Sequence, residues 1–202
     1  MCPNQANHQR PTYQMMIITK IFLSIILLAT LIGCSEVNDE INVDLNQNFI
    51  IKGAFGINIS SVDKTLPEGY LVENKAITFI PNNVDARFVQ YEYSTTPKSH
   101  IIYGIKAKSP RELPTDSCLK HRKNLIKQTL DTLGDTSQLK ITEVKNKWKI
   151  RESNQREITI DCEISISPEH RQLVMIHQDT ALSVLAFREW RKRQKDITLI
   201  RF

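Results

Sequence analysis

The stretch REITIDCEIS, residues 156–165, alternates apolar and polar side chains along its length. Ile158, Ile160, Cys162 and Ile164 fall on one side of an extended chain, and charged residues or threonine fall on the other. A period of two is typical of a strand that buries one face, so this stretch predicts a β-strand. Cys162 then lies on the face that must pack against another layer.

A helix is the layer that the sequence predicts opposite this strand. Residues 114–134 read PTDSCLKHRKNLIKQTLDTLG, in which Pro114-Thr115-Asp116 provides a stop and a capping side chain and Gly134 provides an exit. Cys118 falls in the first turn, on the apolar side. The positions that recur at helical spacing on that side are Cys118, Leu119, Arg122, Leu125, Ile126, Thr129, Leu130 and Leu133.

An antiparallel hairpin is predicted earlier in the chain. Residues 88–94 and 100–108 both alternate apolar and polar side chains, and a short loop containing Pro97 joins them. Other elements are expected as shorter strands at residues 70–73, 77–80, 141–143, 148–152 and 173–177, a short helical segment at 60–66, and a last helix from Asp179 or Thr180 to about Lys195.

A run of twelve uncharged residues near the N-terminus indicates export. Residues 21–32 read IFLSIILLATLI, and Lys20 precedes them. A membrane-spanning helix needs about 20 apolar residues, whereas a positive charge followed by a shorter apolar run is typical of a signal peptide. The alternative, a buried core helix, would carry a polar face, and this segment has only Ser24 and Thr30.

The run ends in Leu31-Ile32-Gly33-Cys34, which resembles the lipobox of bacterial lipoproteins. In that family the signal peptide is cut before the cysteine, whose thiol receives a diacylglycerol and whose new amine is acylated. The resemblance implies a signal peptide at residues 15–33, a lipid on Cys34 and attachment to a membrane. It also implies an outer-membrane location facing the periplasm, because Ser35 and not aspartate follows the cysteine.

Composition indicates the nature of the segments on either side of that motif. Residues 1–14 are polar and unpatterned, which indicates either an over-called start codon or an extended n-region of the signal peptide. Residues 34–48 contain four acidic residues and no cation, so they predict a flexible acidic tether. The formal net charge of the chain is +5, so the single domain expected at residues 49–202 is basic.

Export leaves two cysteines to explain. Cys2 is removed with the leader and Cys34 is lipidated, so Cys118 and Cys162 remain in an oxidising compartment, where they most simply pair. A zinc site needs four ligands, and none is expected from two isolated cysteines. A reactive thiol is the remaining alternative to this disulfide.

These patterns together predict an α+β domain. We expect an antiparallel sheet with two main helices packed on one face, one of them tied by the Cys118–Cys162 disulfide. About 150 residues are enough to bury a core of that kind.

Catalytic motifs are missing from the sequence. It contains no G-x-S-x-G, H-E-x-x-H, P-loop or G-x-G-x-x-G pattern and only six glycines, so no catalytic residue and no cofactor are predicted. His177 is interpreted as a hydrogen-bonded residue of an apolar strand. Asp161 and Glu163 are interpreted as the polar face of the strand that carries Cys162. An enzyme would need His177 and these carboxylates in one concave cluster.

The strongest surface feature is REWRKRQK, residues 188–195. Its cations could attract anionic lipid headgroups or an acidic protein, and a solvated helix end is the alternative. Export disfavours nucleic acid as a partner, although the pI is near 9.0. The residues expected to contact a partner or membrane are Arg188, Trp190, Arg191, Lys192, Arg193 and Lys195.

The sequence therefore favours a lipid-anchored periplasmic protein that binds another macromolecule without catalysis. An immunity protein or inhibitor of a periplasmic toxin or hydrolase is a sharper form of that hypothesis. The alternative is a structural envelope lipoprotein that contacts peptidoglycan, lipopolysaccharide or membrane through its basic C-terminal helix. A small hydrolase is a third hypothesis.

Overall fold

The computed structural model describes residues 48–67, 76–144 and 147–199, with side chains described as far as residue 195. The segment at residues 1–14, the leader predicted at 15–33, Cys34 with nearly all of the tether, and the strand expected at 70–73 lie outside the described residues. None of the described helices is long and apolar enough to cross a membrane.

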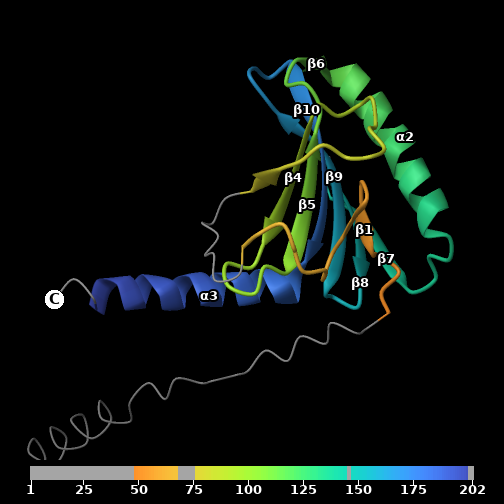
Figure 1. Cartoon of the computed structure of the whole chain (residues 1–202). Coiled ribbons are helices and arrows are strands. Elements are labelled where there is room, and N and C mark those ends of the chain that lie inside the picture. The colour runs from red at the N-terminus through yellow and green to blue at the C-terminus, as the bar shows by residue number, and fades with distance from the viewer. Residues whose placement is uncertain (1–47, 68–75, 145–146, 200–202) are drawn as a thin grey trace, which may run out of the picture. The chain divides into compact units, whose positions relative to one another are not determined.

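The centre of the fold is an eight-stranded sheet in which the described pairings are antiparallel (Figure 1). Its order in space is β3, β4, β5, β10, β9, β8, β7, and β6 pairs with the start of β10. The strands are β3 (Ile77–Thr78), β4 (Gln90–Thr95), β5 (Ile102–Lys108), β6 (Leu113–Pro114), β7 (Leu139–Val144), β8 (Lys147–Glu152), β9 (Arg156–Ile164) and β10 (His170–Asp179). The predicted hairpin is confirmed as β4 and β5, and the predicted strand with Cys162 is confirmed as β9.

Alternation along the strands gives the sheet one apolar and one polar face. The register places Tyr93, Ile105, His177, Ile158 and Ile150 in one row across β4, β5, β10, β9 and β8, and all five are buried. Lysine, glutamate, aspartate and threonine dominate the intervening positions of β8 and β9. The core therefore lies on one side of the sheet, where the helices pack.

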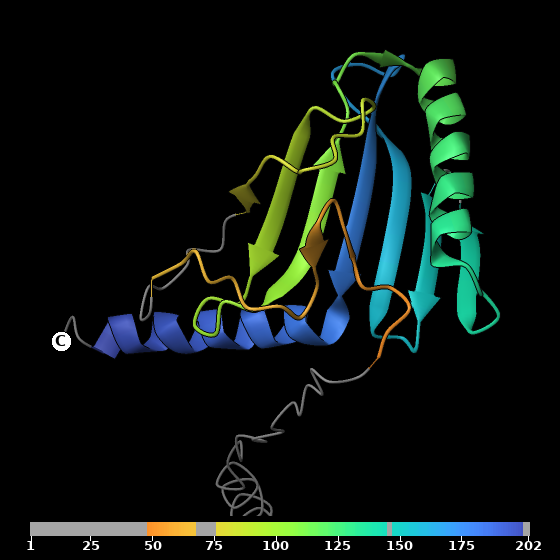
Figure 2. The ribbon, with the colours of Figure 1, turned by 45° about the vertical axis from the view of Figure 1, so that its right-hand side comes forward.

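Helix α2 (Thr115–Leu133) runs along the strands on the apolar face (Figure 2). It contacts β9 and β10, and the predicted disulfide is confirmed between Cys118 on α2 and Cys162 on β9, with a Cα–Cα distance of 6.1 Å. The helix ends as expected at Gly134, which has a left-handed φ of 70°. The expected side-chain cap is wrong, because the hydroxyl of Thr115 instead donates a hydrogen bond to the carbonyl oxygen of Glu169.

Helix α3 (Thr180–Leu199) crosses the ends of β5 and β10 (Figure 2). Its first turns pack against the same apolar face, where Leu182 joins a cluster that includes Tyr93 and Ile105. The fold class predicted from the sequence is thus confirmed: an antiparallel sheet with two helices, one of them tied to the sheet by a disulfide.

The N-terminal segment of the domain completes the cover of the apolar face. A small hairpin of β1 (Gly53–Ala54) and β2 (Ile57–Asn58) brings Phe55 and Ile59 into the core clusters. The helical segment expected at residues 60–66 is wrong. The backbone N–H of Ser60 donates to the carbonyl of Ile102, and Val62 forms an isolated antiparallel bridge with Ile101, so this stretch is a β-bridge between turns.

Candidate functional site on helix α3

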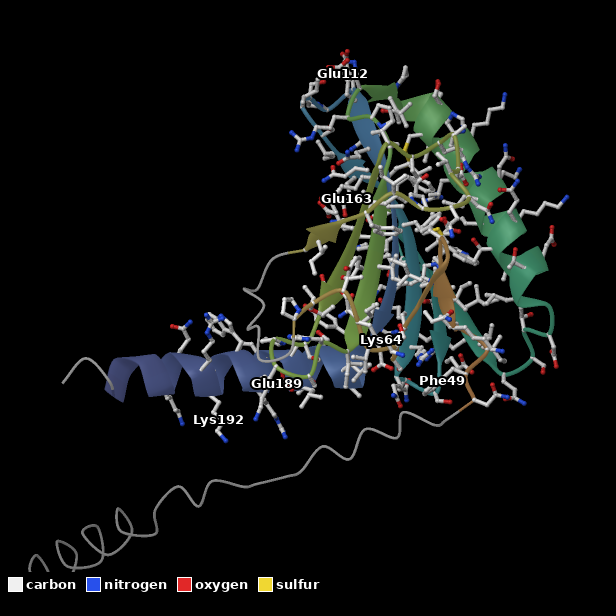
Figure 3. The ribbon with its side chains drawn as sticks, viewed as in Figure 1. Phe49, Lys64, Glu112, Glu163, Glu189 and Lys192 are labelled. Atoms are coloured by element: carbon white, nitrogen blue, oxygen red, sulfur yellow. A yellow bond between two sulfur atoms is a disulfide. The ribbon has the colours of Figure 1, made fainter. Side chains whose placement is uncertain are left out.

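The first half of α3 is built into the fold. Leu182 is fully buried and Ala186 is nearly so. One helical turn further, Glu189 binds the loop between β4 and β5, since its carboxylate accepts hydrogen bonds from the backbone N–H of Lys98 at 2.7 Å and from the hydroxyl of Ser99 at 2.9 Å. These contacts fix the direction in which the rest of the helix continues (Figure 3).

A stack of one exposed and one half-buried aromatic ring follows on another side of the helix. Phe187 is 54% exposed, and its ring stacks on that of Trp190 with centroids 6.3 Å apart. The guanidinium of Arg191 lies 5.5 Å from the centre of the Phe187 ring, within the range of a cation–π interaction. Val184, which is 46% exposed, lies one turn earlier on the same side.

More cations follow the stack along the helix. Arg191 and Lys192 are exposed and Arg193 is half-buried, and Figure 3 shows Lys192 on the part of α3 beyond Glu189. We use the name aromatic–cationic surface for Phe187, Trp190, Arg191, Lys192 and Arg193. The other two predicted contact residues, Arg188 and Lys195, are exposed and also take part in interactions within the protein.

Sequence reasoning found most of this surface but missed Phe187. The basic run drew attention to Trp190 and Arg191, which the structure does bring together. Phe187 lies three residues before Trp190 and four before Arg191, and that helical spacing is the signal that could have found it. Its ring is what joins the two predicted residues into one surface.

A buried ionic cluster holds the start of α3. The guanidinium of Arg156 lies 3.3 Å from the carboxylate of Asp179, and both side chains are almost fully buried. The other carboxylate oxygen of Asp179 caps α3 by accepting a hydrogen bond from the backbone N–H of Leu182 at 3.0 Å. Burial lowers the pKa of Arg156, while the negative charge of Asp179 opposes that shift.

The same cluster holds the start of the domain. Arg156 donates to the carbonyl of Ile51 at 2.6 Å, and its guanidinium lies 4.1 Å above the ring of Phe49. The carboxylate of Glu152 accepts hydrogen bonds from the backbone N–H groups of Ile50 and Ile51. Phe49 and α3 therefore lie at the same end of the sheet (Figure 3).

The carboxylates considered for catalysis lie apart from His177. Asp161 and Glu163 are paired in register with Val174 and Gln172 and lie on the polar face, whereas His177 lies on the apolar face. Asp161 is 3.5 Å from the ammonium of Lys147. The structure thus does not bring the three groups into one cluster, and no group of three or more potential metal ligands occurs among the described residues.

Further ion pairs lie on the polar face of the sheet. Glu157 contacts Lys149 at 2.8 Å and Arg151 at 2.5 Å. Burial alone would raise the pKa of Glu157, but the hydrogen bonds from Lys149, Arg151 and Thr159 hold it below its usual value. On the described strands, the polar face of the sheet therefore carries ion pairs.

His177 itself departs from its interpretation. It is buried, but neither ring nitrogen has a hydrogen-bond partner among the described residues, so the interpretation as a hydrogen-bonded sheet residue is wrong. Its cross-strand neighbours Ile105 and Ile158 carry no polar side-chain atom, which explains the missing partners. Burial lowers the pKa of His177 to about 4.

No protein-family model, curated protein sequence or solved structure matches this chain.

Proposed function

We propose that this chain is an exported, lipid-anchored binding module that uses the aromatic–cationic surface of α3 to hold a protein with an acidic surface. One observation carries the proposal: the exposed Phe187 and Arg191 and the half-buried Trp190 form a stack on a helix that is fixed by its other half. Tryptophan and arginine are enriched among the residues that dominate protein–protein binding energy, and the run of cations on the same helix favours a negatively charged partner.

The compartment in this proposal is the periplasmic side of the outer membrane. The resemblance of Leu31-Ile32-Gly33-Cys34 to a lipobox supports export and a lipid on Cys34. The Cys118–Cys162 disulfide supports it further, because such bonds persist mainly in oxidising compartments. An exported toxin or hydrolase is then the partner class, which would make the chain an immunity protein or inhibitor.

A binding role is favoured over hydrolysis by the placement of the titratable groups. His177 is separated from Asp161 and Glu163 by the thickness of the sheet. General acid–base catalysis needs its groups within hydrogen-bond reach of the same substrate. These three side chains cannot meet that requirement together.

The anchor is tested by Cys34→Ala. Because the lipid would be attached to this thiol, the variant should lose labelling by a clickable fatty acid and accumulate as unprocessed precursor. Cys118→Ala in the same cells is the matched control and should keep the label. A label that survives in Cys34→Ala would contradict the anchor.

The partner surface is tested by photo-crosslinking in living cells. A photo-reactive amino acid at Val184, beside the stack, should give a discrete adduct with an acidic protein. The control position is Val144, which is also exposed but lies on β7 at the far edge of the sheet. Combining the Val184 probe with Arg191→Glu and Lys192→Glu should remove the adduct, because the charge attraction is reversed. An adduct that survives this reversal, or that forms equally from Val144, would contradict the proposed surface.

A second candidate function is contact with an anionic membrane or lipopolysaccharide surface. It is favoured by the position of Phe49, which lies at the same end of the sheet as α3 and follows the tether. Tryptophan favours the membrane interface, and each Lys or Arg near an anionic surface contributes about 1 kcal/mol. Unlipidated Cys34→Ser protein would then co-sediment with vesicles containing phosphatidylglycerol but not with pure phosphatidylcholine. Sedimentation that is insensitive to Arg191→Glu would exclude α3 as the contact.

A further inference from the structure

The sheet has a step at the end where β8 begins. Lys147, the first residue of β8, pairs with Asp161, whereas β9 continues beside β10 as far as Ile164. Beyond Asp161, β9 therefore has no neighbour on the β8 side among the described residues. A hollow of about 750 Å³ lies along β8 and reaches this step. Sites for small molecules commonly have volumes of about 300–1,000 Å³, so the hollow has room for a whole small molecule.

Backbone N–H groups at the step point to its open side. Cys162 lies opposite Leu173 of β10, and the N–H and the C=O of Leu173 both bind Ser109 on the other side of that strand. This pair therefore exchanges no backbone hydrogen bond, and the N–H of Cys162 points away from β10. The N–H of Ile164, two residues further along β9, points the same way. Backbone N–H groups that no neighbouring strand uses can bind an anion.

Cations outnumber acids in the lining of the hollow, which includes four cationic and two acidic side chains. The side chain of Lys147 is 45% exposed, and its ammonium lies 3.5 Å from the carboxylate of Asp161. An ammonium has three donors, so this contact leaves others for a ligand. The guanidinium of Arg171 lines the same hollow and forms no hydrogen bond or ion pair with the described residues. A negatively charged group can therefore gain charge-assisted hydrogen bonds here.

Two exposed apolar side chains border the same hollow. Val144, at the end of β7, is 61% exposed, and Ile164, at the end of β9, is 67% exposed. An apolar body that lies over them would remove both side chains from water, which is favourable. The hollow thus offers cations to the acidic end of a ligand and an apolar border to the rest of it.

The disulfide fixes this end of β9. Cys162, whose N–H points to the open side of the step, is bonded to Cys118 in the first turn of α2. A strand end with a neighbour on only one side would otherwise be weakly held. Because the bond holds the step in place without a ligand, binding there loses little affinity to ordering of the protein.

We propose that this hollow binds a small anionic amphiphile, a free molecule with one acidic group on an apolar body. The acidic group is held by Lys147, Arg171 and the N–H groups at the step, and the apolar body lies against Val144 and Ile164. This site is separate from the aromatic–cationic surface and does not depend on the partner proposed for it. Because the ligand is a small molecule, it gives no protein adduct with a crosslinking probe at Val144.

The test uses 8-anilinonaphthalene-1-sulfonate as the probe and N-phenyl-1-naphthylamine, which has the same rings, as its match without the acidic group. The protein is the unlipidated Cys34→Ser chain that also carries Arg191→Glu and Lys192→Glu, so that the cations of α3 cannot hold the probe. At pH 7 we expect saturable binding of the sulfonate by fluorescence titration, about tenfold tighter than that of the amine. Equal affinities for the two probes, or no saturable binding of the sulfonate, would overturn the proposal.

Further variants of that protein locate the site. Lys147→Gln together with Arg171→Gln should abolish the preference for the sulfonate. The control, Lys140→Gln with Lys123→Gln, also removes two cations, one from β7 and one from α2, and should keep the preference. Ile164→Ser removes part of the apolar border, so it should weaken the binding of both probes about equally. An unchanged preference in the first variant, its loss in the control as well, or unchanged affinities in Ile164→Ser would also overturn the assignment.

Discussion

The two helices are attached to one sheet by different chemistry. Helix α2 has no side-chain cap among the described residues and is fixed by the Cys118–Cys162 bond, and its buried residues extend from Cys118 to Thr129. Helix α3 has no such bond and is fixed at its start by Asp179, which is buried, ion-paired and capping.

The difference shows which part of the chain the fold needs. Most of the length of α2 is needed to cover the apolar face. In α3 the first turns contribute to the core, while the following turns carry an exposed aromatic ring and a run of cations. A helix segment that contributes little burial is available for binding, which is why we place the partner surface there.

The largest loss in the free energy of unfolding should come from breaking the ion pair that attaches α3. Asp179→Ala removes the closest ion-pair partner of the buried Arg156 guanidinium and also removes the cap, so we expect a loss of about 5 kcal/mol in the free energy of unfolding. Urea denaturation followed by circular dichroism measures it. Asp131→Ala, an exposed carboxylate on α2, is the control and should leave the midpoint unchanged. A loss no larger than that of the control would mean that α3 is held by other contacts.

The next largest loss in the free energy of unfolding should come from breaking the disulfide that attaches α2. The two cysteines are 44 residues apart, and closing a loop of that size should contribute about 4 kcal/mol by restricting the unfolded chain. Cys118→Ala and Cys162→Ala should therefore each lose about 2–5 kcal/mol, and the double variant should lose about as much as either single one. The same denaturation assay decides it. Additive losses would show that the thiols contribute by packing and not by their bond.

These two attachments also show what the sequence could predict. The disulfide was predictable because Cys118 and Cys162 lie on the apolar stripes of a helix and a strand, and both stripes must be buried. The pair of Arg156 and Asp179 was not, because a period of two gives the face of a residue but not its neighbour on the next strand. Only the pairing of β9 with β10 brings these two residues together.

The same limit explains the errors at the candidate sites. Periodicity correctly places His177 in a buried row, but it contains no information on whether a polar atom lies nearby. The local sequence favours a cap at Thr115, but in the structure its hydroxyl donates a hydrogen bond to Glu169, which is distant in sequence. The basic run of α3 was visible from composition alone, since it depends on no tertiary contact.

A third loss of stability is expected from His177, which lies on the sheet face that α2 covers. The pKa of His177 is lowered to about 4 in the folded protein, from 6.5, so below pH 6.5 the unfolded chain binds a proton that the folded one does not. Stability should therefore fall as the pH drops from about 6.5 to about 4, with a loss of about 3 kcal/mol from this residue. Urea unfolding of the wild type and of His177→Leu across that range isolates the contribution, because the carboxylates titrate in both. Parallel curves for the two proteins would mean that His177 is protonated or solvated in the folded state.

The smallest change in the free energy of unfolding is expected for a variant in the exposed half of α3. It tests whether only the first turns of that helix belong to the core. Phe187→Ala should change the free energy of unfolding by no more than about 0.5 kcal/mol, because the ring is more than half exposed and lies outside the core. The matched variant in the first half is Leu182→Ala, which removes a fully buried side chain and should cost about 3 kcal/mol. Both are measured by urea denaturation under the same conditions, and Phe187→Ala should still weaken the crosslink from Val184. If the two variants were equally destabilising, the exposed half of α3 would be part of the folding core, and its aromatic stack would need no partner to explain it.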